Sequence, residues 1–140
     1  MSWKSFSYAF TVLELDLDSF GHMNNATYLN YFEKARWELI TLNGYGFKQV
    51  HEYQQGPTIL EIQLSFKKEI KLRDRVIIQS QVKNYEGKVG VLVQEMFFEG
   101  SSELLCRAEL KVALFDMKKR RLIEPTPLWR QAIGEELRES

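Results

Sequence analysis

The chain opens with a strict alternation of apolar and polar positions. Phe6, Tyr8, Phe10 and Val12 are separated by small or polar residues, and this period of two predicts a strand with one buried face. The alternation stops between residues 15 and 25, where Asp, Ser, Gly, His and Asn accumulate. These residue types are typical of loops and helix caps, so we expect an irregular segment there.

A long helix is predicted from Asn25 to Leu42. An asparagine at position 24 or 25 is a suitable cap for its first amides, and Gly44 is suited to end it. At a rise of ~1.5 Å per residue the helix is on the order of 25 Å long, enough to lie along a sheet. Its apolar face is formed by residues at helical spacing, namely Tyr28, Phe32, Ala35 and Leu39, with Tyr31 and Trp37 beside them.

The second half of the chain is predicted to be rich in strands, after a short helical stretch around residues 46–53. Gly56 and Pro57 open it, and turn-forming residues divide it into segments. The predicted strands cover residues 58–67, 75–83, 89–99 and 103–116, with turns at 71–74, 84–87, 99–101 and 116–120. Connections this short require antiparallel pairing, because a parallel crossover needs about a dozen residues.

A short final helix is predicted after Thr126, which is suited to cap it, with Pro127 as its first helical residue. Its apolar side is formed by Leu128, Ile133 and Leu137. Together the elements predict a single α+β domain over residues 1–140, with an antiparallel sheet packed around one long helix. One helix covers only one face of such a sheet, so the other face or an exposed edge needs a cover. We expect a second copy of the chain there, in a homodimer or in a homotetramer of two dimers.

The net charge and the cysteine content argue against several classes of function. Lysine plus arginine and aspartate plus glutamate both number 19, and this zero net charge argues against nucleic acid as a partner. Cys106 is the only cysteine, which excludes an intramolecular disulfide and a cysteine-based metal cluster. The first residues contain no apolar segment of signal-peptide or membrane-span length, so we expect a cytoplasmic protein without a membrane span.

Residues 15–25 contain the candidate catalytic side chains. Asp16, Asp18 and His22 lie on a loop that leads into the N-terminus of the predicted buried helix. The first amides of a helix lack intrahelical acceptors and carry the positive end of the helix dipole. Such an end stabilises a developing oxyanion, and a nearby carboxylate can act on water or on a carbonyl carbon. These are the two requirements of a thioester hydrolase.

The same segment resembles a known family. Asp-x-Asp-x-x-Gly-His-Met-Asn-Asn at 16–25, followed by Tyr-x-x-Tyr-Phe-Glu-x-Ala-Arg at 28–36, resembles the hotdog-fold acyl-CoA thioesterases of the 4-hydroxybenzoyl-CoA thioesterase family. It is also similar to the plant acyl-carrier-protein thioesterases, which carry His-Val-Asn-Asn. The resemblance covers about residues 6 to 130 and implies a hotdog fold that hydrolyses acyl-CoA or acyl-carrier-protein thioesters, with no metal and no cofactor.

The resemblance also implies roles for individual residues. Asp18 matches the catalytic aspartate, as a nucleophile or as a general base, and the backbone N–H of Asn25 matches the oxyanion donor. His22 matches a histidine proposed to act in the plant branch, although Phe20 stands where that branch has asparagine. Lys88, in the turn that often holds coenzyme A phosphates, and Tyr28 are the expected substrate-binding residues. The basic group at residues 67–73 is the other candidate for the phosphates.

Three alternatives remain open at this point. Glu33 is a second candidate carboxylate, because another branch of hotdog thioesterases uses a helix glutamate; the simpler interpretation is an i,i+3 ion pair with Arg36. Hotdog hydratases resemble Asp-x-Asn-Pro-x-His, a spacing that Asp18 and His22 do not match. A non-catalytic module that binds acyl thioesters is the alternative from another class, but binding alone does not require the carboxylate of Asp18.

Overall fold

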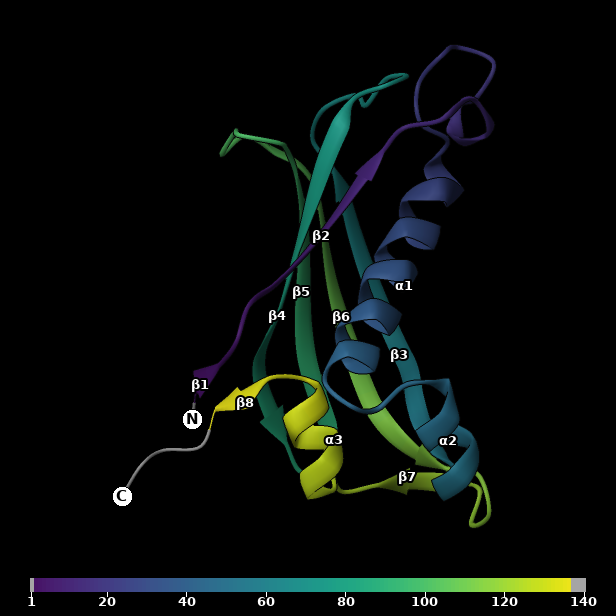
Figure 1. Cartoon of the computed structure of the whole chain (residues 1–140), viewed down its shortest axis with the longest axis vertical. Coiled ribbons are helices and arrows are strands. Elements are labelled where there is room, and N and C mark those ends of the chain that lie inside the picture. Colours follow the sequence, from purple (N-terminus) through teal and green to yellow (C-terminus); the bar gives the residue numbers. More distant parts are fainter. Residues whose placement is uncertain (1, 137–140) are drawn as a thin grey trace.

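An antiparallel sheet packs around one long helix in the computed structural model, which describes residues 2–136 (Figure 1). The strand order is β2-β4-β5-β6-β3, and β7 pairs with the end of β6. The strands are β2 (Phe6–Thr11), β3 (Gln55–Phe66), β4 (Arg75–Glu86), β5 (Val89–Phe98), β6 (Leu104–Asp116) and β7 (Arg121–Ile123). This architecture confirms the α+β hotdog arrangement predicted from the sequence.

Helix α1 (Asn25–Leu42) has the predicted bounds. The side chain of Asn24 caps it by accepting a hydrogen bond from the Ala26 amide at 2.9 Å. The four residues of its predicted apolar face are all buried, as is Tyr31, whereas Trp37 is half-buried. Two short helices, α2 (Phe47–Tyr53) and α3 (Pro127–Ala132), lie at the end of the sheet opposite the start of α1 (Figure 1). Within residues 2–136, no helix combines the length and apolar character that a membrane crossing requires.

Several boundaries differ from the predictions. Strand β3 begins at Gln55 rather than residue 58, and β4 continues to Glu86 through a bulge near Val82. The predicted turn at residues 84–87 is therefore only the two residues Gly87 and Lys88. The sequence pattern did not predict four very short elements. They are β7, the paired strands β1 (Ser2–Trp3) and β8 (Glu135–Glu136), and the 3-10 turn η1 (Glu14–Asp16). Leu137, assigned to the final helix, lies outside the described residues.

The two faces of the sheet have opposite character. Inward-facing residues of the central strands, such as Ile78, Met96 and Leu110, are fully buried and form one core with α1. On the outer face, Arg107 lies 3.8 Å from Glu95 and 3.7 Å from Glu109, and Lys111 lies 3.1 Å from Glu61. An outer face with this many ion pairs is suited to water. Among residues 2–136 the sheet leaves two strand edges unpaired, at β2 and at β3.

Candidate active site

Asp18 is held in the loop before α1 by backbone hydrogen bonds. Its Oδ1 accepts from the amide of Phe20 at 2.9 Å and from the amide of His22 at 3.2 Å. Gly21 adopts a left-handed φ of 81°, which glycine tolerates without strain and which lets the chain double back. Within residues 2–136, Oδ2 of Asp18 makes no hydrogen bond or ion pair. One carboxylate oxygen therefore fixes the group while the other is available to a substrate.

The first amide of α1 is also available. Asn24 uses its side chain to accept from Ala26 N and its carbonyl to accept from Thr27 N, both at 2.9 Å. The Asn25 N–H finds no acceptor among residues 2–136, and Asn25 is exposed to solvent. A free amide at the positive end of a helix attracts negative charge. The Asn25 N–H is thus open to a ligand, as the oxyanion role predicted for it requires.

Asp16 holds the loop together rather than facing the cavity. Its Oδ2 accepts from the Leu13 amide at 2.9 Å and from the hydroxyl of Tyr31 at 2.6 Å. Its backbone carbonyl accepts from the Asn24 amide at 2.8 Å. Burial, together with the hydrogen bond to Asp16, raises the pKa of Tyr31. Asp16 therefore ties the loop to α1 and to the residue that caps it.

A cavity of about 310 Å³ brings together four of the five predicted site residues, Asp18, His22, Asn25 and Tyr28. Its other walls come from Met23 and from the end of β3 and the loop that follows, residues 66–69. Burial first, and then the nearby Cys106, Glu69 and Asp18, raise the pKa of Tyr28 to about 12. Tyr28 thus stays protonated at neutral pH and keeps a hydroxyl that can donate to a ligand.

Glu69 is the acidic residue of the cavity that the sequence analysis missed. Its Oε2 lies 3.3 Å from Nε2 of His22, and both side chains are partly exposed. The His22 imidazole therefore faces Glu69, whereas its backbone amide binds Asp18. No motif surrounds Glu69 in the sequence; the bridge between His22 and Lys71 and the hydrogen bond from the Met23 amide to the Ile70 carbonyl at 2.8 Å bring the two loops together. His22 thus acts on Asp18 through its main chain.

The structure does not place Lys88 or Glu33 as the sequence predicted. Lys88 is exposed in the turn after β4. This strand has 12 residues and begins just after the loop that lines the cavity, so Lys88 follows its far end. It lies about 40 Å along that strand from the cavity, so it does not join the site within one subunit. The predicted ion pair of Glu33 with Arg36 is wrong: among residues 2–136, Arg36 Nη1 donates instead to Gln94 Oε1 at 3.0 Å. The buried amide of Gln94 attracts the guanidinium toward the sheet.

Comparisons with known proteins find acyl-CoA thioesterases of similar sequence and solved structures of similar fold. The long-chain acyl-CoA thioesterase FadM of Escherichia coli is 28% identical over 107 residues, covering 76% of this chain and 80% of FadM. The acyl-CoA thioesterase YbgC of Haemophilus influenzae is 27% identical over 117 residues, covering 83% of this chain and 85% of YbgC. The fold matches that of SAV2348 of Staphylococcus aureus, solved in complex with CoA, with a TM-score of 0.85 at 17% identity, over 100% of this chain and 92% of that one.

The family assignment rests on a broader match. The model of the Thioesterase-like superfamily matches residues 12–136, from the end of β2 to the last described residue. This span includes the loop with Asp18, all of α1 and every long strand of the sheet except β2. The chain belongs to the Thioesterase-like superfamily.

Proposed function

We propose that this chain is an enzyme that hydrolyses acyl-CoA thioesters to a free acid and coenzyme A. The observation that carries the proposal is the pairing, in one cavity, of an anchored carboxylate with a free amide at a helix N-terminus. The names of the relatives FadM and YbgC support the same substrate class. A cytoplasmic site of action is part of the proposal.

The mechanism uses these two groups on opposite sides of the thioester. The Asn25 N–H donates to the carbonyl oxygen and stabilises the negative charge that builds there during attack. The free oxygen of Asp18 either takes a proton from the attacking water or attacks the carbonyl carbon itself. The carbon–sulfur bond then breaks, and the sulfur takes up a proton from water or from the protonated Asp18 and leaves as the thiol. Where Asp18 is the nucleophile, water then hydrolyses the mixed anhydride, which releases the free acid and restores the carboxylate. His22 keeps Asp18 in position through its amide.

The test of the function is a panel of acyl-CoA thioesters of varied chain length and type. We expect the purified chain to release free thiol from at least part of the panel, without any added metal or cofactor. Detection of the thiol reports cleavage of the thioester bond directly. Binding of acyl-CoA without thiol release from any member would instead favour the non-catalytic binding module.

A homodimer formed through β3 is part of the proposal. Among residues 2–136 no strand pairs with the outer edge of β3, and its inward side chains Ile62 and Phe66 are 41% and 48% exposed. An open strand edge with apolar side chains favours pairing with a second copy. A two-fold axis near the middle of β3 makes that pairing antiparallel and continues the sheet across both subunits.

Sedimentation velocity at micromolar concentration tests this assembly. We expect a dimer, and we expect Ile62→Lys to weaken it and to reduce activity in parallel, because a charge would then have to be buried in the interface. Ser7→Lys, on the opposite edge of the sheet, is the matched control and should stay dimeric. A wild-type monomer with full activity would contradict the proposal, and a tetramer would require a second interface on another surface.

The coenzyme A phosphates are proposed to bind basic residues near the cavity. Lys67 lines it and has no ion-pair partner among residues 2–136, whereas Lys68 lies 3.0 Å from Glu103. The two-fold axis through β3 also brings Lys88 of the partner subunit to this end of the sheet. Lys67→Glu and Lys88→Glu should therefore raise KM for acyl-CoA with little change in kcat.

The control for these charge reversals is Lys118→Glu, at an exposed position in the turn after β6. It should leave both kinetic constants unchanged. If Lys67→Glu and Lys88→Glu are equally silent, the phosphates do not bind there. An acyl-carrier protein then becomes the better candidate for the thioester carrier.

A further inference from the structure

Four consecutive basic residues lie where the chain turns from β6 into β7, at the end of the sheet where α2 lies (Figure 1). All four are exposed, and none has an ion-pair partner among residues 2–136. We call this segment the basic turn; it comprises Lys118, Lys119, Arg120 and Arg121. The basic turn concentrates positive charge at one end of a chain whose net charge is zero.

The basic turn has a fixed conformation. Asp116 closes it, because its Oδ1 accepts from the amides of Lys118 at 2.9 Å and of Lys119 at 2.8 Å. Arg120 adopts a left-handed φ of 57°, a conformation that favours glycine. Its guanidinium lies over the ring of Phe115, 5.2 Å from the ring centroid. An arginine at a position that favours glycine supports a functional role for its charge.

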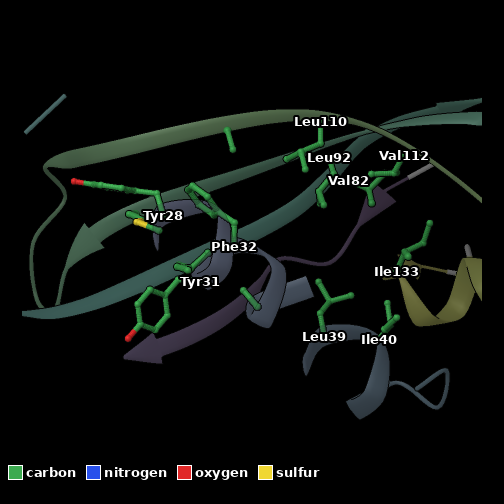
Figure 2. Packing of buried hydrophobic residues seen from close by; sticks show 14 of the residues in the cluster. Tyr28, Tyr31, Phe32, Leu39, Ile40, Val82, Leu92, Leu110, Val112 and Ile133 are labelled. Carbon is green, nitrogen blue, oxygen red and sulfur yellow. The ribbon is translucent and has the colours of Figure 1, made fainter. Parts of the chain in front are cut away.

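Exposed apolar side chains lie at the same end of the subunit. Helix α2 is tied to the basic turn, since the Met117 amide donates to the Gln54 carbonyl at 2.8 Å. The core beneath is already closed, because Leu39 and Ile40 at the end of α1 are buried in one cluster with Ile133 (Figure 2). Large apolar side chains outside this core are exposed to 73%, 70% and 42%, in the order Leu42, Phe47 and Tyr53. This end therefore combines free cations with apolar groups that no core residue covers.

We propose that this end of the subunit docks on the anionic surface of a lipid bilayer. Cations attract anionic headgroups, apolar side chains insert between them, and stable peripheral binding needs both signals. The exposed carboxylates at this end, Glu38, Glu52 and Glu124, are fewer than its cations, to which Lys48 of α2 adds one more. Nucleic acid fits less well, because the chain has no overall positive charge. An acidic protein matches the cations, but the exposed apolar groups favour a bilayer.

Docking at this end brings a candidate active site to the bilayer in the proposed β3 dimer. The basic turn follows Asp116, which pairs with Gln55 at the start of β3, whereas Phe66 at the end of β3 lines the cavity at Asp18. Antiparallel pairing of two β3 strands therefore places the Asp18 cavity of one subunit at the end that carries the basic turn of its partner. Long-chain acyl-CoAs are amphiphilic and collect at bilayer surfaces. Delivery of such substrates rests on the proposed function, whereas the docking itself does not.

Sedimentation with vesicles tests the docking. We expect the wild-type chain to bind vesicles of phosphatidylcholine mixed with phosphatidylglycerol but not vesicles of phosphatidylcholine alone, and high salt should weaken the binding. Lys119→Gln combined with Arg121→Gln should lower the partition coefficient by about 10–100-fold, because two attractive charges are lost. Phe47→Ser should lower it by about tenfold, because an inserted ring is lost. Lys4→Gln combined with Lys83→Gln removes the same charge away from this end and should bind like the wild type.

The outcomes separate docking from the other possibilities. Equal binding to anionic and neutral vesicles, or wild-type binding by the Lys119 and Arg121 double variant, would overturn the inference. Retention on polyglutamate or on DNA without vesicle binding would also overturn it and assign the surface to an acidic protein or to nucleic acid.

Hydrolysis of two substrates tests the delivery. The double variant should cleave a soluble short-chain acyl-CoA at the wild-type rate, but a long-chain acyl-CoA held in anionic vesicles about tenfold more slowly. Equal rates on the vesicles would overturn the role in delivery. A wild-type chain that binds anionic vesicles but cleaves no acyl-CoA would contradict the proposed function and support the docking.

Discussion

Replacing Asp18 with asparagine should lower kcat for thioester hydrolysis by about 10²–10⁴-fold. The substitution preserves the shape of the side chain and its Oδ1, which accepts from the amides of Phe20 and His22. It removes the negative charge at the oxygen that has no partner within residues 2–136, and with it the general base or nucleophile. The loop should therefore keep its conformation, and KM should change little. Steady-state kinetics of thiol release measures both constants.

Two further variants act as controls for Asp18. His22→Ala should cost less activity, because the bond from His22 to Asp18 comes from the backbone and survives the change. Glu33→Gln should leave kcat with a short-chain acyl-CoA nearly unchanged, since within one subunit Glu33 lies on the order of 12 Å along α1 from Asn25. Near-native turnover by folded Asp18→Asn would refute the mechanism. A collapse of activity in Glu33→Gln would instead assign the reaction to the helix glutamate.

Asn25→Pro should lower kcat by about 10²–10³-fold, the usual effect of losing one oxyanion donor. Proline lacks the N–H that the mechanism assigns to the thioester oxygen, and the first position of a helix is where proline is best tolerated. Asn24 already has φ −63° and ψ 140°, which a residue before proline adopts readily. The substitution therefore removes one hydrogen-bond donor with little effect on the fold.

The matched control is Asn25→Ala, which removes the side chain and keeps the amide. Its activity should stay close to that of the wild type, because the proposed role belongs to the main chain. Circular dichroism of both variants checks that α1 is retained. Equal losses in the two variants would mean that the side chain of Asn25 is the functional group and that the oxyanion assignment is wrong.

Much of the fold was predictable because its signals are local. The cap at Asn24 and the apolar spacing along α1 fixed that helix to the residue, and the turn residues separated the long strands. The loop residues Asp18 and His22 share a cavity with Asn25 and Tyr28, as expected from their closeness in the sequence. Short sequence motifs therefore predicted which residues of this loop and helix lie close together.

The remaining features depend on contacts between distant segments, which no local pattern reports. Glu69 reaches His22 only because the loop after β3 folds back to the loop before α1. Arg36 was expected to pair with its helix neighbour Glu33, but a buried glutamine 58 residues away accepts its hydrogen bond. The bulge in β4 allowed the strand to pass through residues that resemble a turn. Each difference has a tertiary cause.

The most direct test of the account is a crystal structure of Asp18→Asn with an intact acyl-CoA bound. We expect the thioester oxygen at about 2.7–3.1 Å from the amide nitrogen of Asn25. The side chain at position 18 should lie over one face of the thioester carbonyl group, beside the carbonyl carbon or beside an ordered water next to it. A thioester bound away from the N-terminus of α1, with the Asn25 amide facing solvent, would contradict the mechanism.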